Sequence, residues 1–272
     1  MTTDDTDSGY LLTNAKPEAA ARFAAFTSLF DPSTFRHMDD LGLAAGWRCW
    51  EVGAGGTSVV EHLAARVGPD GHVLATDIDI TWTAAAHAAS ADPNTEIRAH
   101  DAALDPPPDG PFDLVHARLV LVHVPDRAAA LRNMVSVLRP GGWLFLEDAD
   151  PALQPLSCLE EIGPEQQLAN RIRTGFRALM AERGVDLAYG RTLPRLLREA
   201  GLCEVGADAA FPISLPACAD LETATIGLIR GQLVTNAIAT DPEIDRHLAA
   251  VAAGRLDLTQ PPMISCWGQR PL

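Results

Sequence analysis

Apolar residues along this chain form two kinds of segment, and the two kinds alternate. Short apolar runs, such as residues 72–77 and 112–116, are typical of buried strands. The longer segments between them, such as 58–67 and 126–138, have apolar positions three or four residues apart, as amphipathic helices do. Because strand and helix alternate, the pattern predicts a parallel sheet with helices on both faces.

The complete pattern predicts an α/β fold. Strands are expected over residues 48–52, 72–77, 95–99, 112–116, 143–148, 203–212 and 263–267, and helices over 17–29, 32–43, 58–67, 81–89, 126–138, 164–183, 192–200, 221–237 and 242–251. This order predicts a Rossmann-like, doubly wound, mostly parallel seven-stranded sheet with helical cap insertions. Ligands of such sheets bind at the carboxyl ends of the strands.

A glycine turn follows the strand over 48–52. Gly53 and Gly55 stand where the chain is expected to leave that strand and enter the next helix. Residues without a Cβ let the backbone turn tightly there and lie against a ligand. Asp77 ends the following strand, where a carboxylate can accept hydrogen bonds from both hydroxyls of a ribose. Together these residues predict a nucleotide pocket.

The spacing of the glycines helps to distinguish between classes of nucleotide. The dinucleotide fingerprint ends on a third glycine, and Ser58 takes that position here. The lysine-containing end of a phosphate loop is also missing, so a pyrophosphate is a poor fit. Glu51, two residues before Gly53, points instead to a ligand with an ammonium group near the turn.

Residues of about 45 to 150 carry a resemblance to a known family. The segment from Glu51 to Thr57 resembles the first motif of class I S-adenosylmethionine-dependent methyltransferases of the bacterial small-molecule type, with Thr57 in place of its last glycine. Asp77 resembles the family's ribose-binding acid. The segments 98–102, 112–118 and 138–144 resemble, in order, its adenine-reading acid, its fourth-strand motif and its turn into the fifth strand.

The resemblance implies a set of residues that contact S-adenosylmethionine. They are Tyr10, Glu51, Gly53, Ala54, Gly55, Asp77, Ile78, Asp101, Ala102, His116 and Arg118. Arg118 is expected to pair with the methionine carboxylate, and the alternative is a surface ion pair with Asp113 or Asp126.

A base that accepts a proton from a hydroxyl or amine must lie within hydrogen-bonding reach of it. His123, which follows the fourth strand, is the candidate, and the alternative is that it packs under the next helix. Glu147, Asp148 and Asp150 at the end of the fifth strand are candidates for substrate contacts, a base or oxygen ligands of a divalent metal. Because a single segment supplies all three, we expect no metal site.

The composition of the chain excludes some classes of binding partner. The chain has 21 basic and 36 acidic residues, a formal net charge of −15, which argues against nucleic acids and anionic membranes as targets. The five cysteines contain no C-x-x-C pair, and the sequence shows neither a secretory signal nor a membrane-spanning run. We therefore expect a cytoplasmic protein with a small-molecule substrate and a possible homodimer.

The expected architecture is a single domain over residues 1–272. Within it, 1–45 would form an N-terminal helical cap and 46–150 the cofactor-binding core. Insertions over 151–190 and 217–255 would surround the substrate site, and 256–272 would contain the last strand.

Two functional hypotheses remain open at this level. The first is methyl transfer to an O, N or C centre of a small, secondary-metabolite-like molecule by in-line displacement, with S-adenosylhomocysteine as the product. The second is a protein of the same fold that binds S-adenosylmethionine without methylating, as a sensor or in a cyclisation. A nicotinamide dehydrogenase is disfavoured by Ser58.

Overall fold

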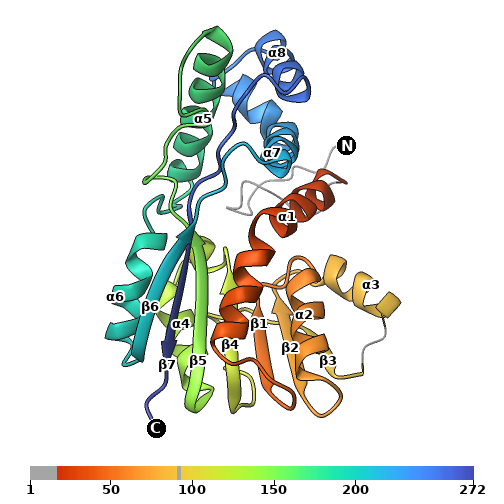
Figure 1. Cartoon of the computed structure of the whole chain (residues 1–272), viewed down its shortest axis with the longest axis vertical. Helices are drawn as coiled ribbons and strands as arrows, with labels where there is room; N and C mark the ends of the chain where they lie inside the picture. Colours follow the sequence, from red (N-terminus) through yellow and green to blue (C-terminus); the bar gives the residue numbers. More distant parts are fainter. Residues whose placement is uncertain (1–16, 91–92) are drawn as a thin grey trace. The chain divides into compact units, whose positions relative to one another are not determined.

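The computed structural model describes residues 17–90 and 93–272, and these residues form a seven-stranded sheet (Figure 1). The strands are β1 (Arg48–Val52), β2 (His72–Asp77), β3 (Thr95–Ala99), β4 (Phe112–Arg118), β5 (Leu138–Ala149), β6 (Cys203–Ala210) and β7 (Met263–Gln269). Their order across the sheet is β3-β2-β1-β4-β5-β7-β6, and the pairs from β3 to β5 are parallel. β7 lies between β5 and β6 and runs antiparallel to both. The predicted fold class is confirmed.

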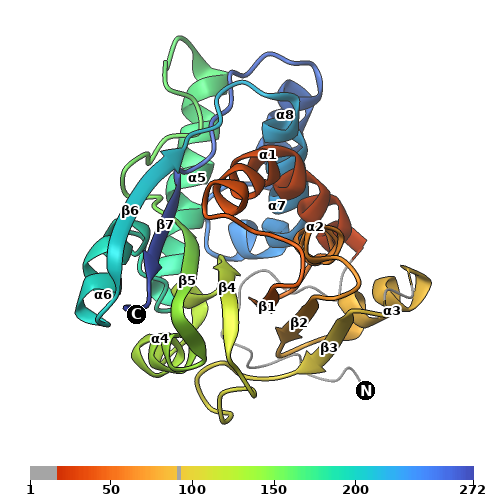
Figure 2. The same cartoon turned by 60° about the horizontal axis from the view of Figure 1, so that its bottom comes forward.

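Helices connect the strands and cover both faces of the sheet. They are α1 (Pro17–Asp40), α2 (Ser58–Val67), α3 (Thr81–Ser90), α4 (Arg127–Ser136), α5 (Pro164–Glu182), α6 (Leu193–Glu199), α7 (Pro216–Thr235) and α8 (Asp241–Ala252), with the short 3₁₀ helices η1 (Leu121–His123) and η2 (Gly190–Thr192). In Figure 2 the C-terminal part of α1 and α2 lie on one side of the strands, and α4 and α6 lie on the other. Within the described part of the chain, none of the helices is both long and apolar enough to cross a membrane.

The chain separates into two compact units. The first, here called the sheet unit, contains Thr27–Leu153, Ala188–Phe211 and Pro261–Leu272. The second, the helical unit, contains Gln154–Leu187 and Pro212–Gln260 together with the start of α1 up to Phe26. The helical unit has a core of its own, and its two long segments overlap the predicted insertions over 151–190 and 217–255, whose role stays a prediction.

The core of the sheet unit lies between the strands and the helices α1 and α2. Its fully buried side chains include Met38, Leu63, Val73, Leu114 and Phe145. This packing sets the carboxyl ends of β1, β2 and β4 side by side.

Two elements differ from the sequence prediction. A break was expected at Pro32, but α1 runs through it as one helix, because buried residues on both sides, Phe30 and Met38, keep the helix against the sheet. The glycine pair before Trp143 was expected to form a turn. Instead β5 begins at Leu138, and Gly141 and Gly142 exchange backbone hydrogen bonds with Arg270.

The helical unit is tied together by a buried group of three charged or polar side chains, one on each long helix. Arg173 of α5 lies 2.9 Å from Oε2 of Glu222 on α7, and Nε2 of His247 on α8 lies 2.9 Å from Oε1 of the same carboxylate. All three residues are at most 6% exposed. Burial by itself raises the pKa of Glu222, but Arg173 and His247 lower it to about 2. The group therefore links α5, α7 and α8 through one ionised carboxylate.

Candidate functional site

The turn after β1 has the tight geometry that the glycines predict. Gly53 has φ +73°, and the amides of Gly53 and Ala54 both donate to the carbonyl of Thr76 at the end of β2, at 2.7 and 2.9 Å. A Cβ on Gly53 would collide with the side chain of Val120. The turn therefore requires glycine for two reasons, its backbone conformation and the lack of space beside it.

Asp77 and Asp101 lie at the ends of neighbouring strands. The backbone amide of His100, which precedes Asp101, donates to the carbonyl of Asp77 at 2.9 Å and holds the two strand ends together. Burial raises the pKa of Asp77, whose Oδ1 accepts from the amide of Asp79 at 3.0 Å. Oδ1 of Asp101 accepts from the amides of residues 103 and 104 and so shapes its own turn.

The flanking residues in the predicted set are placed differently from one another. Ala102 is buried, and its carbonyl accepts from Asn133 at 3.0 Å. The side chain of Ile78 is largely exposed beside the end of β2. Tyr10, the remaining member of the set, lies outside the described residues. A direct ligand contact of each stays a prediction.

A buried row of charged side chains lies beneath the glycine turn. His116 is paired with Glu51 in the register of β1 and β4, and Nδ1 of its ring lies 2.6 Å from Oε2 of Glu51. The other ring nitrogen, Nε2, lies 3.3 Å from Oε2 of Glu147. All three residues are at most 3% exposed. Both ring nitrogens of His116 have carboxylate partners in the structure, and its direct contact with the cofactor stays a prediction.

These contacts determine the charge of the histidine. Burial alone would lower the pKa of His116, but the charges and hydrogen bonds of Glu51 and Glu147 outweigh burial and raise its pKa to about 9. Burial would likewise raise the pKa of Glu147, but His116, Arg118 and Ser265 lower it. An imidazolium thus lies between two carboxylates at neutral pH, and each of its N–H groups has an acceptor.

Helix α1 supplies further members of this row. The Thr34 hydroxyl donates to Oε2 of Glu147 at 2.6 Å, and Ser265 of β7 donates to its Oε1 at 2.6 Å. Nη1 of Arg118 lies 2.8 Å from Oδ1 of Asp31 and donates to Thr34 at 3.1 Å. Arg118 therefore has a partner on α1, and the alternative surface pair with Asp113 or Asp126 is wrong. Its pairing with a ligand carboxylate stays a prediction.

The candidate base His123 ends η1, a short helix that is held from two sides. Arg127 donates to the carbonyls of Leu121 and Val122, both at 3.0 Å, and its guanidinium lies over the ring of Tyr189. From the other side, Asp148 accepts a hydrogen bond from the backbone of Val122. His123 itself is exposed, and the loop that carries it is held by these contacts.

The three acids at the end of β5 do not converge. Glu147 and Asp148 point to opposite faces of the sheet, as successive residues of a strand do. Burial raises the pKa of Asp148 well above its usual range, and its Oδ1 has no hydrogen-bond partner among the described residues. Asp150 accepts two hydrogen bonds from the guanidinium of Arg191, at 2.6 and 2.5 Å, and a third from its backbone amide at 3.1 Å. Among the described residues, no group of three potential ligands is arranged to hold a metal ion.

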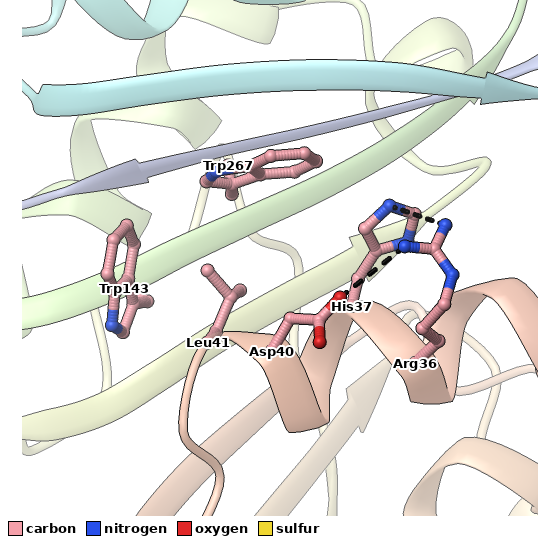
Figure 3. Close-up of a pocket in the computed structure, with 6 residues that line it drawn as sticks. All are labelled: Arg36, His37, Asp40, Leu41, Trp143 and Trp267. Atoms are coloured by element: carbon pink, nitrogen blue, oxygen red, sulfur yellow. Dashed lines mark hydrogen bonds and ion pairs between the residues drawn. The ribbon is translucent and has the colours of Figure 1, made fainter.

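A hollow of about 290 Å³ opens elsewhere in the sheet unit (Figure 3). Its lining residues are Arg36, His37, Asp40, Leu41, Trp143 and Trp267. None of these lining residues belongs to the glycine turn. Arg36 pairs with Asp40 and with Asp208, and His37 also pairs with Asp208.

Comparison with known proteins agrees with this arrangement. Residues 50–146 match the family model described as the methyltransferase domain. This segment of the chain is similar to the methyltransferase domain family. The matched residues begin inside β1 and end inside β5, so they include the glycine turn, Asp77, Asp101, His116 and η1.

Individual relatives extend the comparison. Methyltransferase str2 of Strobilurus tenacellus is 33% identical over 159 residues, which cover 57% of this chain and 53% of that protein. The ubiquinone/menaquinone biosynthesis C-methyltransferase UbiE of Vibrio cholerae is 33% identical over 127 residues, 45% of this chain and 49% of that protein. The chain thus spans about half the length of these relatives.

A solved structure shows the same fold. Phosphoethanolamine N-methyltransferase 2 of Haemonchus contortus, in complex with S-adenosyl-L-methionine, has a TM-score of 0.60 at 13% identity. The match covers 96% of this chain and 58% of that one. At this identity the likeness concerns the methyltransferase fold alone.

Several residues of the buried row were not predicted from the sequence. Asp31 and Thr34 flank Pro32, and this segment looked like a break between two helices. Ser265 interrupts the apolar strand β7, and a polar residue inside a buried strand needs a hydrogen-bond partner. That signal pointed to a partner but could not name Glu147.

Proposed function

We propose that this chain binds S-adenosylmethionine and transfers its methyl group to a small-molecule acceptor. The observation that carries the proposal is the turn at Gly53 within a methyltransferase domain, where backbone conformation and Val120 leave no room for a side chain. On either side of the turn, Glu51 and Asp77 belong to the adjacent parallel strands β1 and β2. Carboxylates at these two positions suit an ammonium group and a ribose.

In this proposal each part of the ligand is assigned to a described segment or side chain. The Gly53–Gly55 backbone would lie against it, Asp77 would accept from its ribose hydroxyls, and the segment from Asp101 would meet its adenine. Glu51 would receive its ammonium group. When bound, S-adenosylmethionine supplies a methyl group on a positively charged sulfur, from which an in-line nucleophile can displace it.

The protein would contribute to the reaction mainly by positioning the methyl donor and the acceptor. Holding donor and acceptor close and collinear provides much of the rate enhancement in a displacement of this kind. For a hydroxyl or amine acceptor, we assign to His123 the removal of the acceptor proton. Its position at the end of a fixed η1, next to the Val120 that contacts Gly53, supports this assignment.

The acceptor is proposed to be a small molecule of secondary-metabolite type with an O, N or C centre. The relatives do not narrow this, because one of them is named a C-methyltransferase and the solved structure an N-methyltransferase. The formal net charge of −15 disfavours nucleic acid as an acceptor. The helical unit, formed by the two insertions, is proposed to determine which acceptor is used. A cytoplasmic location and a homodimer stay predictions of the sequence.

Titration calorimetry tests the cofactor directly. The purified chain is titrated in parallel with S-adenosylmethionine, S-adenosylhomocysteine and NADH. Micromolar binding of the first two without the third is the expected result. Binding of NADH alone would show that the glycine turn serves a different nucleotide.

Turnover separates methyl transfer from cofactor binding without reaction. Release of S-adenosylhomocysteine is measured with a panel of phenol, amine and activated-carbon acceptors. Once an acceptor is found, His123→Ala should lower turnover and leave the dissociation constant of S-adenosylhomocysteine nearly unchanged. Full turnover of the variant at every pH would remove His123 as the base, and tight cofactor binding without turnover on any acceptor would favour a protein that does not methylate.

A further inference from the structure

The carboxylate of Glu51 is held by a hydrogen bond to His116, a residue outside the glycine motif. Its Oε2 lies 2.6 Å from Nδ1 of His116, and the carboxylate is 3% exposed. Oε1 accepts from no donor in the part of the chain that the structure describes. One oxygen is therefore fixed by the protein while the other remains for a ligand.

His116 is itself fixed at its second nitrogen. Nε2 lies 3.3 Å from Glu147, whose two oxygens also accept from Thr34 and Ser265, each at 2.6 Å. The imidazole therefore cannot rotate away from Glu51 without losing a contact to Glu147. The row runs from the glycine turn across β4 and β5 to β7, and Thr34 joins it to α1.

The charges of this row do not cancel. Glu51, Glu147 and Asp31 carry three negative charges, and the His116 imidazolium and Arg118 carry two positive ones. One negative charge is left in excess in a buried place, where an uncompensated charge is costly. A ligand ammonium group placed at Glu51 would compensate it locally, whereas a ligand without a cationic group at this end would not.

We propose that His116 is a positioning residue for the cofactor's amino-acid end, which it controls by holding Glu51 against the ligand ammonium. This inference rests on the proposed function, because it takes S-adenosylmethionine as the ligand. His116 does not touch the ligand. It orients one carboxylate oxygen, compensates the cost of burying that carboxylate, and connects it through Glu147 to α1.

The test compares two ligands that differ at this end only. S-adenosylhomocysteine carries the ammonium and carboxylate groups, and 5′-methylthioadenosine shares the adenosine thioether but lacks both. Dissociation constants are measured by calorimetry for the wild type, Glu51→Gln, His116→Gln and the double variant. His116→Gln should weaken S-adenosylhomocysteine by about tenfold or more, as loss of a hydrogen bond to a charged group does, and leave methylthioadenosine within about twofold.

The double variant tests whether His116 affects ligand binding through Glu51. If His116 acts through Glu51, the double variant should bind S-adenosylhomocysteine no more weakly than the weaker single variant. His247→Gln is the matched control, because His247 is also buried and paired with a glutamate, but in the helical unit. It should leave the ratio of the two dissociation constants unchanged.

Several outcomes would overturn the inference. Weakening of both ligands by the same factor would mean that His116 only supports the fold, and unchanged binding of both would leave it no role at this end of the ligand. Additive losses in the double variant would remove the link to Glu51. If the wild type binds neither ligand, the proposed function fails instead. Should His116→Gln not fold, ¹⁵N NMR of histidine-labelled wild type at pH 7.5 decides, since a buried imidazolium with two protonated nitrogens is expected and a neutral ring would contradict the inference.

Discussion

The glycine turn requires a residue without a side chain at position 53. A side chain there meets Val120 and must also adopt φ +73°, a conformation that costs a residue with a Cβ about 1 kcal/mol or more. Val120 in turn leads into η1. A change at this single position would therefore alter both the turn and the loop that carries His123.

Gly53→Ala should lower the free energy of unfolding by about 2 to 4 kcal/mol, the sum of backbone strain and overpacking, and should abolish measurable binding of S-adenosylhomocysteine. Urea unfolding and calorimetry measure the two effects. Gly42→Ala is the control, because Gly42 has φ +88° but nothing within 4 Å of an added Cβ. Equal losses of stability in the two variants would show that Val120 is not in the way.

Asp77→Ala should weaken S-adenosylhomocysteine binding by about 1.5 to 3 kcal/mol, through loss of charge-assisted hydrogen bonds to the ribose. Calorimetry at constant pH gives the value, and Asp70→Ala, an exposed carboxylate before β2, is the control. A dissociation constant equal to that of the wild type would exclude Asp77 from the site.

At the scale of elements, local pattern predicted most helices and strands because their apolar periodicity matches their burial. The prediction was wrong where tertiary contacts override local preferences. Pro32 lies inside α1, whose buried residues continue on both sides, and Gly141 and Gly142 lie inside β5, where Arg270 supplies hydrogen bonds from a distant segment. Sequence alone could not show either compensating contact.

Arg127 supports the short helix η1, because its planar guanidinium donates to two backbone carbonyls at once. Arg127→Lys keeps the charge but loses this geometry. The variant should lose about 1 to 2 kcal/mol of stability, and the amides of His123 and Val124 should exchange with deuterium faster. Arg132→Lys, on the exposed side of α4, is the control. Unchanged exchange at both amides would show that Asp148 suffices to hold η1.

At the scale of the whole molecule, the sequence predicts insertions over 151–190 and 217–255 within a single domain. Both ranges overlap segments of the helical unit, whose core includes Ile172, Ile229 and Ile244, and their role as insertions around a substrate site stays a prediction. Contiguous motifs give the predicted site residues Glu51, Asp77 and Asp101, whose ligand contacts also stay predictions. The predicted site was incomplete where partners come from distant segments, as with Thr34 and Ser265, because no local pattern encodes which strand lies beside β5.

The helical unit should have its own sensitivity to acid. The pKa of Glu222 is about 2 in the folded protein and near 4.5 when unfolded, so its contribution to stability is present above about pH 4.5 and is lost as pH falls toward 2. Glu222→Gln should remove this contribution and cost about 3 to 5 kcal/mol at neutral pH, because it breaks a buried ion pair. Thermal unfolding from pH 7 to pH 2 measures both effects.

Glu165→Gln provides the comparison, since Glu165 pairs with Arg255 on the surface of the same unit. It should change the thermal unfolding profile little. If the Glu222 variant keeps the acid dependence of the wild type, other carboxylates control the unfolding.

The place of β7 in the sheet has a consequence for the order in which the molecule can be assembled. β6 is synthesised more than fifty residues before β7, yet β7 is the strand that separates it from β5. Until β7 emerges from the ribosome, β6 has no native strand to pair with, and Glu147 lacks the hydroxyl of Ser265. The buried row under the glycine turn is thus completed among the last events of folding, as expected for contacts of long sequence separation, and a chain interrupted before β7 would carry every ligand-binding motif without the hydrogen bond that completes it.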